Sequence, residues 1–281
     1  MMKLKPVKQY VNGFGAMVAD EQRLAQTPRS TTDEYAQDQH ETNVSKTHNY
    51  LVPILERTKS KVVLDVGCGI GTMVNTLVDS GFDAYGIDMV SVEPYWSSHG
   101  CSRDRFFIID PFQFELPFED QSFDLAFSFG VIEHVGTTNG HSQRKKNFHD
   151  ERKQWLREIF RTVKVGGHLL MGGPNRNFPI DVAHGLDAES SKLEILLSRW
   201  TGASVHKTWG DYFLWSYKDI PRYLEGLPFS MEPLSVKGLV AFGRVPSIVR
   251  PLVRGYVDHL PRPFLGTGLN PWMMALIRRT G

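Results

Sequence analysis

A glycine-rich turn that directly follows an apolar run constrains the fold of this chain most. Residues 61–66 (KVVLDV) form a β-branched, apolar run of strand length, and glycines follow it at positions 67, 69 and 71. Such a run is typical of a strand that is buried on both faces of a parallel sheet. Glycine lets the main chain turn sharply there and approach a ligand, because no Cβ stands in the way. The chain therefore contains a strand, a tight turn and a helix, with a ligand expected at the turn.

Apolar runs of strand length alternate with helical patterns along most of the chain. Apolar positions at helical spacing predict helices over 43–58, after Gly71 and over 150–164, and Gly166 and Gly167 are expected to end the last of these. Further strands are predicted at 84–88, 105–110, 123–130, 168–172, 229–236 and 272–278. The alternation of strands and helices favours an α/β fold with a parallel sheet.

The composition disfavours several classes of protein. The 281 residues include 32 basic and 31 acidic side chains, and the net charge of +1 disfavours a nucleic-acid partner. With 41% hydrophobic and 22% charged residues, the chain can bury a sizeable core. No stretch approaches the roughly 18 to 20 uncharged residues that span a bilayer, so we expect neither a membrane span nor a signal peptide. Cys68 and Cys101 are too few for a disulfide scaffold, which favours the reducing cytoplasm.

Two stretches are longer than ordinary connections between strands and helices. We predict an N-terminal arm over 1–42 and one domain over 43–281, with insertions at about 175–215 and 237–270. Long insertions at one end of a sheet are usually lids or binding loops. The second insertion carries an apolar helical stripe over 248–260, and the chain from residue 237 onward has seven basic residues against one acidic one. A surface helix over the core, a lid over an acidic substrate and contact with a membrane or partner remain alternatives for this stripe.

A carboxylate closes the second predicted strand. Asp88 stands 21 residues beyond Gly67, where it can accept hydrogen bonds from both hydroxyls of a ribose. A nucleotide-like cofactor is therefore expected. The dinucleotide fingerprint needs its third glycine at position 72, but this chain has Thr72 there and a glycine at 71. The spacing favours S-adenosylmethionine over NAD, and an NAD-dependent oxidoreductase stays a minor alternative.

In these motifs and several that follow them, the sequence resembles the class I S-adenosylmethionine-dependent methyltransferases, especially the branch of ubiquinone-biosynthesis and small-molecule enzymes. The segments DVGCGIG, YGID, LPFEDQSFD, FGVIEHV and VKVGGHLLMGGPN carry the resemblance from about residue 43 to 175, and the later strands fit more loosely through residue 278. The resemblance implies an α/β, Rossmann-like fold whose seven-stranded, mostly parallel sheet is flanked by helices and has its last strand antiparallel. It also implies S-adenosylmethionine as cofactor and S-adenosylhomocysteine as product.

The resemblance further implies which residues hold the cofactor. Residues of the glycine-rich turn would wrap its methionine part and one face of the adenosyl group, namely Asp65, Gly67, Cys68, Gly69 and Gly71. Asp88 would hold the ribose with Met89 beside it, and Asp110 would accept from the adenine amino group. Phe112 would donate its amide or stack on the base, since the proline before it has no N–H. Phe129 would line the sulfonium side.

Two histidines are candidates for a general base. Methyl transfer mainly needs an acceptor held in line with the S–CH3 bond, and a hydroxyl acceptor also needs a base that titrates near neutral pH. His134 follows the fourth predicted strand and His184 follows the fifth. Near His184, Arg176 would anchor an anionic acceptor and Asp181 would contribute to the acceptor site, with loop hydrogen bonding as the alternative. A metal site at Asp181, His184 and His206 is also considered, but no ligand pair has a diagnostic spacing, so no metal is predicted.

These observations predict an S-adenosylmethionine-dependent methyltransferase that acts on a small-molecule metabolite, with oxygen favoured over nitrogen and carbon as the acceptor atom. The fourth strand lacks the Asn/Asp-Pro-Pro-aromatic turn of adenine-N6 methylases, and neither cysteine follows strand four or five, where carbon-5 pyrimidine methylases need their nucleophile. Two other classes stay open, a non-catalytic protein that binds the cofactor and a partner, and an RNA methyltransferase. The oligomeric state is open as well, with a homodimer as one alternative.

Overall fold

The structure is a computed structural model that describes most of the chain from residue 40 onward. The described residues are 4, 10–11, 16–17, 40, 42–88, 95–96, 100–102, 104–109, 114–138, 143–186, 189–239 and 248–281. The predicted N-terminal arm lies almost wholly outside them. Two short strands from that region, Tyr10–Val11 (β1) and Ala16–Met17 (β2), pair with each other in antiparallel fashion.

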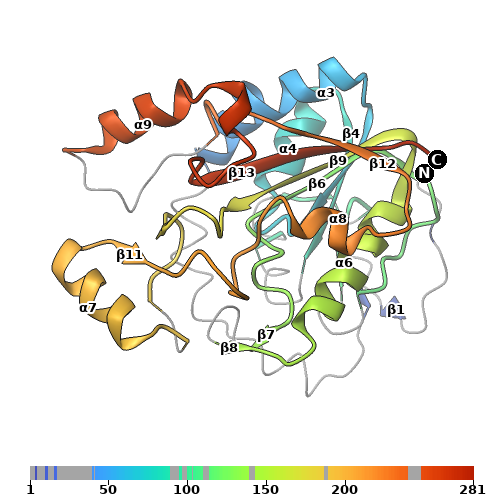
Figure 1. The fold of residues 1–281 in the computed structure, drawn as a ribbon. Coiled ribbons are helices and arrows are strands. Elements are labelled where there is room, and N and C mark those ends of the chain that lie inside the picture. Colours follow the sequence, from blue (N-terminus) through green and yellow to red (C-terminus); the bar gives the residue numbers. More distant parts are fainter. Residues whose placement is uncertain are drawn as a thin grey trace.

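A seven-stranded sheet forms the centre of the molecule (Figure 1). Its strands are β3 (Val62–Val66), β4 (Asp83–Asp88), β5 (Phe106–Ile108), β6 (Phe123–Phe129), β9 (Val163–Pro174), β12 (Phe229–Pro233) and β13 (Trp272–Arg279). Their order in the sheet is β12-β13-β9-β6-β3-β4-β5. The pairings from β9 to β5 are parallel, whereas β13 runs antiparallel to both of its neighbours. The predicted Rossmann-like fold, mostly parallel with an antiparallel last strand, is confirmed.

Helices cover both faces of the sheet, because each strand sends alternate side chains to opposite sides (Figure 1). The principal helices are α3 (Val52–Thr58), which follows the π-helical turn η1 (Thr47–Leu51), α4 (Thr72–Asp79), α6 (Phe148–Thr162), α8 (Asp219–Tyr223) and α9 (Arg250–Asp258). On β3, Leu64 and Val66 join a buried cluster with side chains of α6 and α8. Val63 joins a second cluster with side chains of α3, α4 and α9. The two clusters are the two cores of a three-layer α/β arrangement.

The boundary between α6 and β9 differs from the prediction. The sequence predicts a helix that ends at Gly166 and Gly167, but α6 ends at Thr162 and β9 begins at Val163. Val163 already has an extended backbone and pairs with the start of β6. Gly167 lies inside the strand, where a Cβ would stand 2.6 Å from the carbonyl oxygen of Asp124. This glycine therefore serves the close approach of two strands and does not end the helix.

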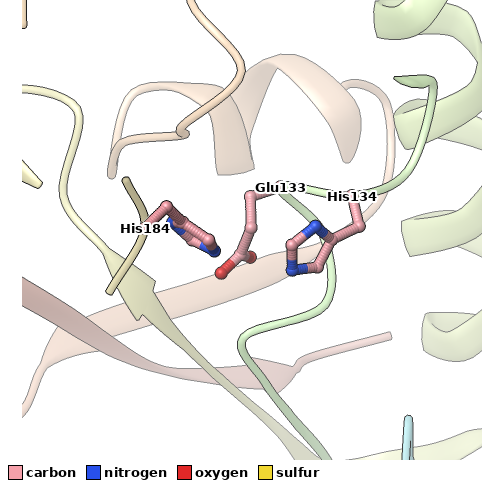
Figure 2. Close-up of side chains that lie close together, drawn as sticks. All are labelled: Glu133, His134 and His184. Carbon is pink, nitrogen blue, oxygen red and sulfur yellow. The ribbon is translucent and has the colours of Figure 1, made fainter. Parts of the chain in front are cut away.

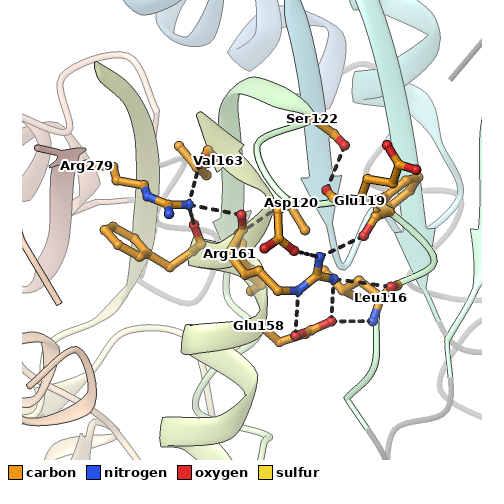
Figure 3. A network of polar contacts seen from close by, with 12 residues as sticks. Leu116, Glu119, Asp120, Ser122, Glu158, Arg161, Val163 and Arg279 are labelled. Atoms are coloured by element: carbon orange, nitrogen blue, oxygen red, sulfur yellow. Dashed lines mark hydrogen bonds and ion pairs between the residues drawn. The ribbon is translucent and has the colours of Figure 1, made fainter. Parts of the chain in front are cut away.

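A polar network holds the end of α6 against the sheet (Figure 3). Arg279, in β13, donates from Nη1 to three backbone carbonyl oxygens at the end of α6 and the start of β9, at 2.8 to 3.2 Å. Carbonyl groups at a helix C-terminus lack partners within the helix, so this guanidinium satisfies them. Arg161 donates in turn to the carboxylates of Glu158 and Asp120. The network fixes the start of β9, whose other end reaches the candidate site.

Both predicted insertions contain regular elements. The short elements outside the central sheet are β7 (Thr137–Thr138), β8 (Gln143–Arg144), β10 (Ile180–Asp181), α7 (Lys192–Thr201), β11 (Ser204–Val205) and η3 (Arg262–Phe264). In the first insertion, β10 and β11 pair in antiparallel fashion on either side of α7. In Figure 1, α7 and α9 extend from the end of the sheet to which β9 points. Among the described residues, no helix combines the length and the apolarity that a membrane crossing needs.

Candidate cofactor and acceptor site

The turn after β3 has the conformation that its glycines predict. Gly67, Gly69 and Gly71 have φ values of +87°, +52° and +85°, which glycine adopts without strain. A Cβ at Gly67 would lie 2.3 Å from a methyl carbon of Val131, and one at Gly71 would lie 2.6 Å from the Phe106 ring. By contrast, apart from Gly69 itself and its two chain neighbours, no atom of the described residues lies within 4 Å of a Cβ built at Gly69. Packing therefore requires Gly67 and Gly71, whereas Gly69 borders space that no described residue fills.

Asp88 lies at the carboxyl end of β4, next to this turn. Its Oδ2 accepts a hydrogen bond of 2.6 Å from the Gly69 amide. Nε1 of the buried Trp96 donates to the Gly69 carbonyl oxygen at 2.7 Å. The backbone of Gly69 is thus held by one acceptor and one donor, and the turn and the Asp88 carboxylate form one site. Trp96 was not among the residues that the sequence singled out.

Asp65 and Cys68 lie buried beside the turn. Burial, and then the nearby Asp88 carboxylate, raise the pKa of Asp65 well above its ordinary range. Burial also raises the pKa of the Cys68 thiol, and a Cβ at Gly86 would lie only 2.8 Å from its sulfur. A thiol that is packed and kept protonated is a poor nucleophile. Cys68 therefore contributes through packing and through its carbonyl oxygen, which accepts from the Gly71 amide at 3.0 Å.

The other predicted cofactor residues divide into one that is described and three that are not. Phe129 ends β6, the strand next to β3, with its ring centroid 5.3 Å from that of Phe127. It therefore lies between the glycine-rich turn and the end of β9, as a residue near the reacting group would. Met89, Asp110 and Phe112 lie outside the described residues. Their roles at the ribose and adenine stay predictions.

The turn after β6 buries a glutamate that the sequence analysis did not place in the site. Glu133 is 0% exposed, and within the described part of the chain neither of its carboxylate oxygens has a hydrogen-bond partner. Burial raises the pKa of Glu133 to about 7, although His184 and Arg152 favour the ionised form. Cβ atoms built at Gly130 and Gly173 would lie 3.7 and 3.3 Å from its carboxylate oxygens. The carboxylate therefore lies over the ends of β6 and β9.

His134 and His184 lie on the two sides of this carboxylate (Figure 2). Their ring centroids are 5.2 Å apart, and the ring planes make an angle of 80°. The two predicted base candidates, 50 residues apart in the sequence, are therefore brought together. The connection is made by β9, which runs parallel to β6 and ends at the same edge of the sheet, and by the segment that follows it.

Asp181 orients the His184 ring. Its Oδ2 lies 3.1 Å from Nδ1 of His184, and its Oδ1 accepts from the amides of Ala183 and His184 at 2.8 and 2.9 Å. Burial opposes ionisation of Asp181, but these hydrogen bonds outweigh it and lower the pKa of the carboxyl group. Because an ionised Asp181 accepts the proton of Nδ1, the lone pair of the His184 ring is left on Nε2.

Arg176 has its charge paired within the protein. Its Nη2 donates to Oγ of Ser216 at 3.1 Å and lies 3.5 Å from Oδ2 of Asp219. Its amide donates to the Trp215 carbonyl oxygen at 2.9 Å. An anionic acceptor would have to compete with Asp219 for this guanidinium. The predicted role of Arg176 as an anion anchor stays a prediction.

Arg152 of α6 joins the turn after β6 to the first insertion. The side chain is 1% exposed and donates to three backbone carbonyl oxygens, those of Val135 at 3.0 Å, Glu133 at 2.9 Å and Phe213 at 2.5 Å. Sequence reasoning missed this residue, although a signal existed. Arg152 stands three and four residues before Trp155 and Leu156, on the apolar stripe of its helix. An arginine on such a stripe indicates that buried hydrogen-bond acceptors surround its guanidinium group.

One group of side chains could hold a metal ion, within the part of the chain that the structure describes. Glu133, His134 and His184 each offer one ligand atom, and these atoms all lie within 4.8 Å of one another. This set differs from the trio considered from the sequence. His206 is not a member, since its Nδ1 lies 2.9 Å from the Lys207 carbonyl oxygen and its ring stacks on that of Tyr212. Asp181 joins the group only through its contact with His184.

Comparisons with known proteins place residues 64–171 in a family described as a methyltransferase domain. A probable S-adenosylmethionine-dependent methyltransferase from Mycolicibacterium smegmatis is 27% identical over 165 residues, 56% of this chain and 57% of that protein. The sterol 4-C-methyltransferase strm-1 of Caenorhabditis elegans is 25% identical over 129 residues, 44% of this chain and 34% of that protein. This chain thus spans about half or less of the length of these two curated relatives.

A solved structure shares the fold over most of this chain. The PH0226 protein from Pyrococcus horikoshii superimposes with a TM-score of 0.50 over 92% of this chain and 98% of that one. The two sequences are 16% identical. At this level of identity, the likeness concerns the arrangement of the strands and helices alone.

Proposed function

The chain belongs to the class I S-adenosylmethionine-dependent methyltransferase superfamily, and we propose that it transfers the methyl group of S-adenosylmethionine to an oxygen atom of a small-molecule metabolite. The superfamily, the methyltransferase class of the domain and S-adenosylmethionine as its cofactor are what the sequence predicts, and the domain match and the curated relatives confirm them. The acceptor, the acceptor atom and the role of each site residue belong to the proposal.

The ends of β3 and β4 fit this cofactor. Gly69 borders space that no described residue fills, and the Asp88 carboxylate stands beside it. Asp88 would accept from the ribose hydroxyls, and the glycine-rich turn would pass along the methionine part. When bound, S-adenosylmethionine supplies a methyl group that a positively charged sulfur has already activated.

The order of the strands in the sheet is the main observation that supports the proposal. The four central strands lie in the order β9-β6-β3-β4, so the cofactor residues at the ends of β3 and β4 adjoin the histidines that follow β6 and β9. Val131, in the turn after β6, packs directly against Gly67 in the turn after β3. An acceptor held at His134 and His184 would therefore lie beside the cofactor, where positioning alone contributes about 7 to 11 kcal/mol.

The two histidines supply the proton acceptor that an oxygen acceptor needs. As the O–CH3 bond forms, the C–S bond breaks with its electron pair on sulfur, and the hydroxyl proton must go to a base. His184 is prepared for this role because Asp181 holds Nδ1–H and leaves Nε2 to accept the proton. His134, on the other side of Glu133, is the second candidate. Such a base accelerates transfer by about a hundred- to ten-thousandfold.

Further proposals concern the whole protein. Residues 43–281 would form one domain, with the insertions at about 175–215 and 237–270 covering the acceptor, and the place of α7 and α9 at the carboxyl end of β9 supports this (Figure 1). The two cysteines are unpaired thiols, which supports a cytoplasmic location. An anionic acceptor and a homodimer are separate predictions. Titration with anionic acceptors tests the first, and gel filtration with light scattering tests the second.

Calorimetric titration with S-adenosylhomocysteine tests the cofactor site. Asp88→Ala removes two hydrogen bonds of about 1.5 to 3 kcal/mol each, so the affinity should fall at least about a hundredfold. Asp83→Ala is the matched control, because Asp83 begins the same strand and pairs with Arg105 at its other end. The control should bind within twofold of the wild type. Unchanged affinity in folded Asp88→Ala protein would refute the assignment of the site.

Turnover on a broad panel of hydroxylated metabolites tests the acceptor class. His184→Ala or His134→Ala should lower the rate without lowering the affinity for S-adenosylhomocysteine if that histidine is the base. If the methyl group is found only on carbon or nitrogen atoms, or only on RNA, the proposed oxygen atom of a small molecule is not the acceptor. Retention of the cofactor without transfer to any acceptor would favour a non-catalytic binding protein.

A further inference from the structure

We propose that Glu133, His134 and His184 bind a divalent transition-metal ion, such as Zn²⁺ or Mn²⁺, through one carboxylate oxygen and two imidazole nitrogens. The proposal stands on the geometry of the three side chains, and it rests on the proposed function only for what the metal would do to an acceptor. Two adjacent residues of the turn after β6 supply two ligands, and the segment after β9 supplies the third.

The geometry is the first observation. Figure 2 shows the Glu133 carboxylate pointing between the two imidazole rings. The three ligand atoms lie within 4.8 Å of one another. Ligand bonds of about 2.0 to 2.2 Å place ligand atoms about 3 to 3.5 Å apart around an ion. Side-chain rotations that move these atoms by about 1 Å would therefore complete the coordination, with no change in the backbone.

The carboxylate is the second, independent observation. Glu133 is fully buried, and among the described residues its two oxygens have no hydrogen-bond donor. A buried carboxylate without a partner is strongly unfavourable, and proteins pair such groups or use them to coordinate metals. The nearby guanidinium of Arg152 donates to the carbonyl oxygen of Glu133 and not to its carboxylate. A cation between the carboxylate and the imidazoles would satisfy it.

Asp181 prepares His184 as a ligand. A ligating histidine usually donates its second ring N–H to a carboxylate, which fixes the tautomer and turns the other nitrogen toward the metal. Asp181 receives Nδ1 of His184 at 3.1 Å and is itself fixed by the Ala183 and His184 amides. His184 therefore presents Nε2 to the group, on the side where Figure 2 shows Glu133.

The ligand types define the class of ion and its use. Two imidazoles and one carboxylate suit Zn²⁺, Mn²⁺, Fe²⁺ or Co²⁺ better than Ca²⁺ or Mg²⁺, which prefer oxygen ligands. Three protein ligands leave coordination positions open, as in catalytic sites. An acceptor hydroxyl bound there would have a lowered pKa and lose its proton to water before its oxygen forms the bond to the methyl carbon. The histidines would then act as ligands, and the acceptor would be a molecule that binds metals through oxygen.

Metal titration of the full chain tests the proposal. After dialysis against a chelator, the protein is titrated with Zn²⁺ by calorimetry and with Co²⁺ by visible absorption, which reports nitrogen and oxygen ligands directly. We expect one equivalent to bind. Glu133→Gln and His184→Gln should each weaken binding at least a hundredfold, and Asp181→Asn about ten- to a hundredfold. His259→Gln, which changes an exposed histidine of the second insertion, should leave binding unchanged.

Two outcomes would overturn the proposal. One is a wild-type protein that takes up no Zn²⁺ or Co²⁺, and the other is undiminished binding by both Glu133→Gln and His184→Gln. Calorimetry with S-adenosylhomocysteine on the same samples verifies that each variant is folded. It also separates the two hypotheses. If the wild type binds S-adenosylhomocysteine but no metal, only the metal site is rejected. If the wild type binds metal but no S-adenosylhomocysteine, the proposed function is rejected and the metal site stands.

Discussion

Gly69→Ala should damage cofactor binding far more than it damages the fold. Gly69 has a φ of +52°, and apart from Gly69 itself and its two chain neighbours no described atom lies within 4 Å of the position of an added Cβ. Gly81, which follows α4, has a φ of +85° and equally open surroundings among the described residues. The positive φ strains alanine at both positions, but only Gly69 lies in the turn between β3 and α4 where the cofactor is expected.

Comparing Gly69→Ala with Gly81→Ala gives the expected losses of stability and of cofactor affinity. A residue with a Cβ costs about 1 to 2 kcal/mol in the left-handed region, and the lost flexibility of the unfolded chain returns about 0.4 to 1 kcal/mol. Both variants should therefore lose about 1 kcal/mol of the free energy of unfolding, a fall in Tm of about 2 to 4 °C for a chain of this size. A methyl group in the space that the cofactor needs adds about 1 to 3 kcal/mol of crowding at Gly69 alone.

Two measurements on each variant separate backbone strain from steric exclusion of the cofactor. Thermal unfolding without ligand should give the same small loss of Tm for Gly69→Ala and Gly81→Ala. Calorimetry with S-adenosylhomocysteine should show a loss of affinity of about 5- to 150-fold for Gly69→Ala and none for Gly81→Ala. If folded Gly69→Ala protein binds within threefold of the wild type, the space beside Gly69 is not where the cofactor lies.

Three further predictions test the surroundings of the site. Gly71→Ala, whose Cβ would stand 2.6 Å from the Phe106 ring, should lower the free energy of unfolding by about 2 to 4 kcal/mol, as urea unfolding measures. Arg152→Met would leave three carbonyl oxygens without their donor, so it should cost more than about 3 kcal/mol and make the first insertion more sensitive to limited proteolysis. At Asp124, burial opposes ionisation, but hydrogen bonds from Lys164 and the amides that open β3 lower its pKa. Its stabilisation is therefore present above the pKa of the unfolded state and lost as the pH falls through the folded-state pKa, and urea unfolding below about pH 4 should show this acid loss in the wild type but not in Asp124→Asn.

The glycine-rich turn and the place of Asp88 beside it could be predicted because both depend on local rules. A buried strand followed by glycines fixes a sharp turn, and the next strand of a parallel sheet places its last residue at the same edge. Asp88 therefore meets Gly69 although 18 residues separate them. These local rules do not predict Trp96, whose indole N–H donates to the Gly69 carbonyl oxygen. Nothing in the sequence around Trp96 indicates which backbone group its N–H will reach.

The residues expected near the methyl acceptor could be predicted only one by one and not as a group. The sequence indicates His134 and His184 individually, each by its place after a strand, but their distance depends on the course of the chain beyond β9. Asp181 fixes that course by accepting the two amides that follow it. From the sequence, a trio of Asp181, His184 and His206 could be considered, but no diagnostic spacing supported it and no metal was predicted. The trio in the structure combines His184 with Glu133 and His134 instead, because β6 and β9 are neighbours in the sheet.

Arg152 shows why a charge pattern could not settle the role of Glu133. A buried arginine near a buried glutamate suggests an ion pair, in which each charge would account for the other. Here the guanidinium donates to the backbone carbonyl oxygens of three residues in two segments, and one of these oxygens belongs to Glu133 itself. The arginine is satisfied by this, and the turn is fixed, but the carboxylate receives no hydrogen bond from any described residue. The imidazoles beside Glu133, or an ion held between them, are the cations that the described residues offer to this carboxylate, and the metal titration distinguishes the two.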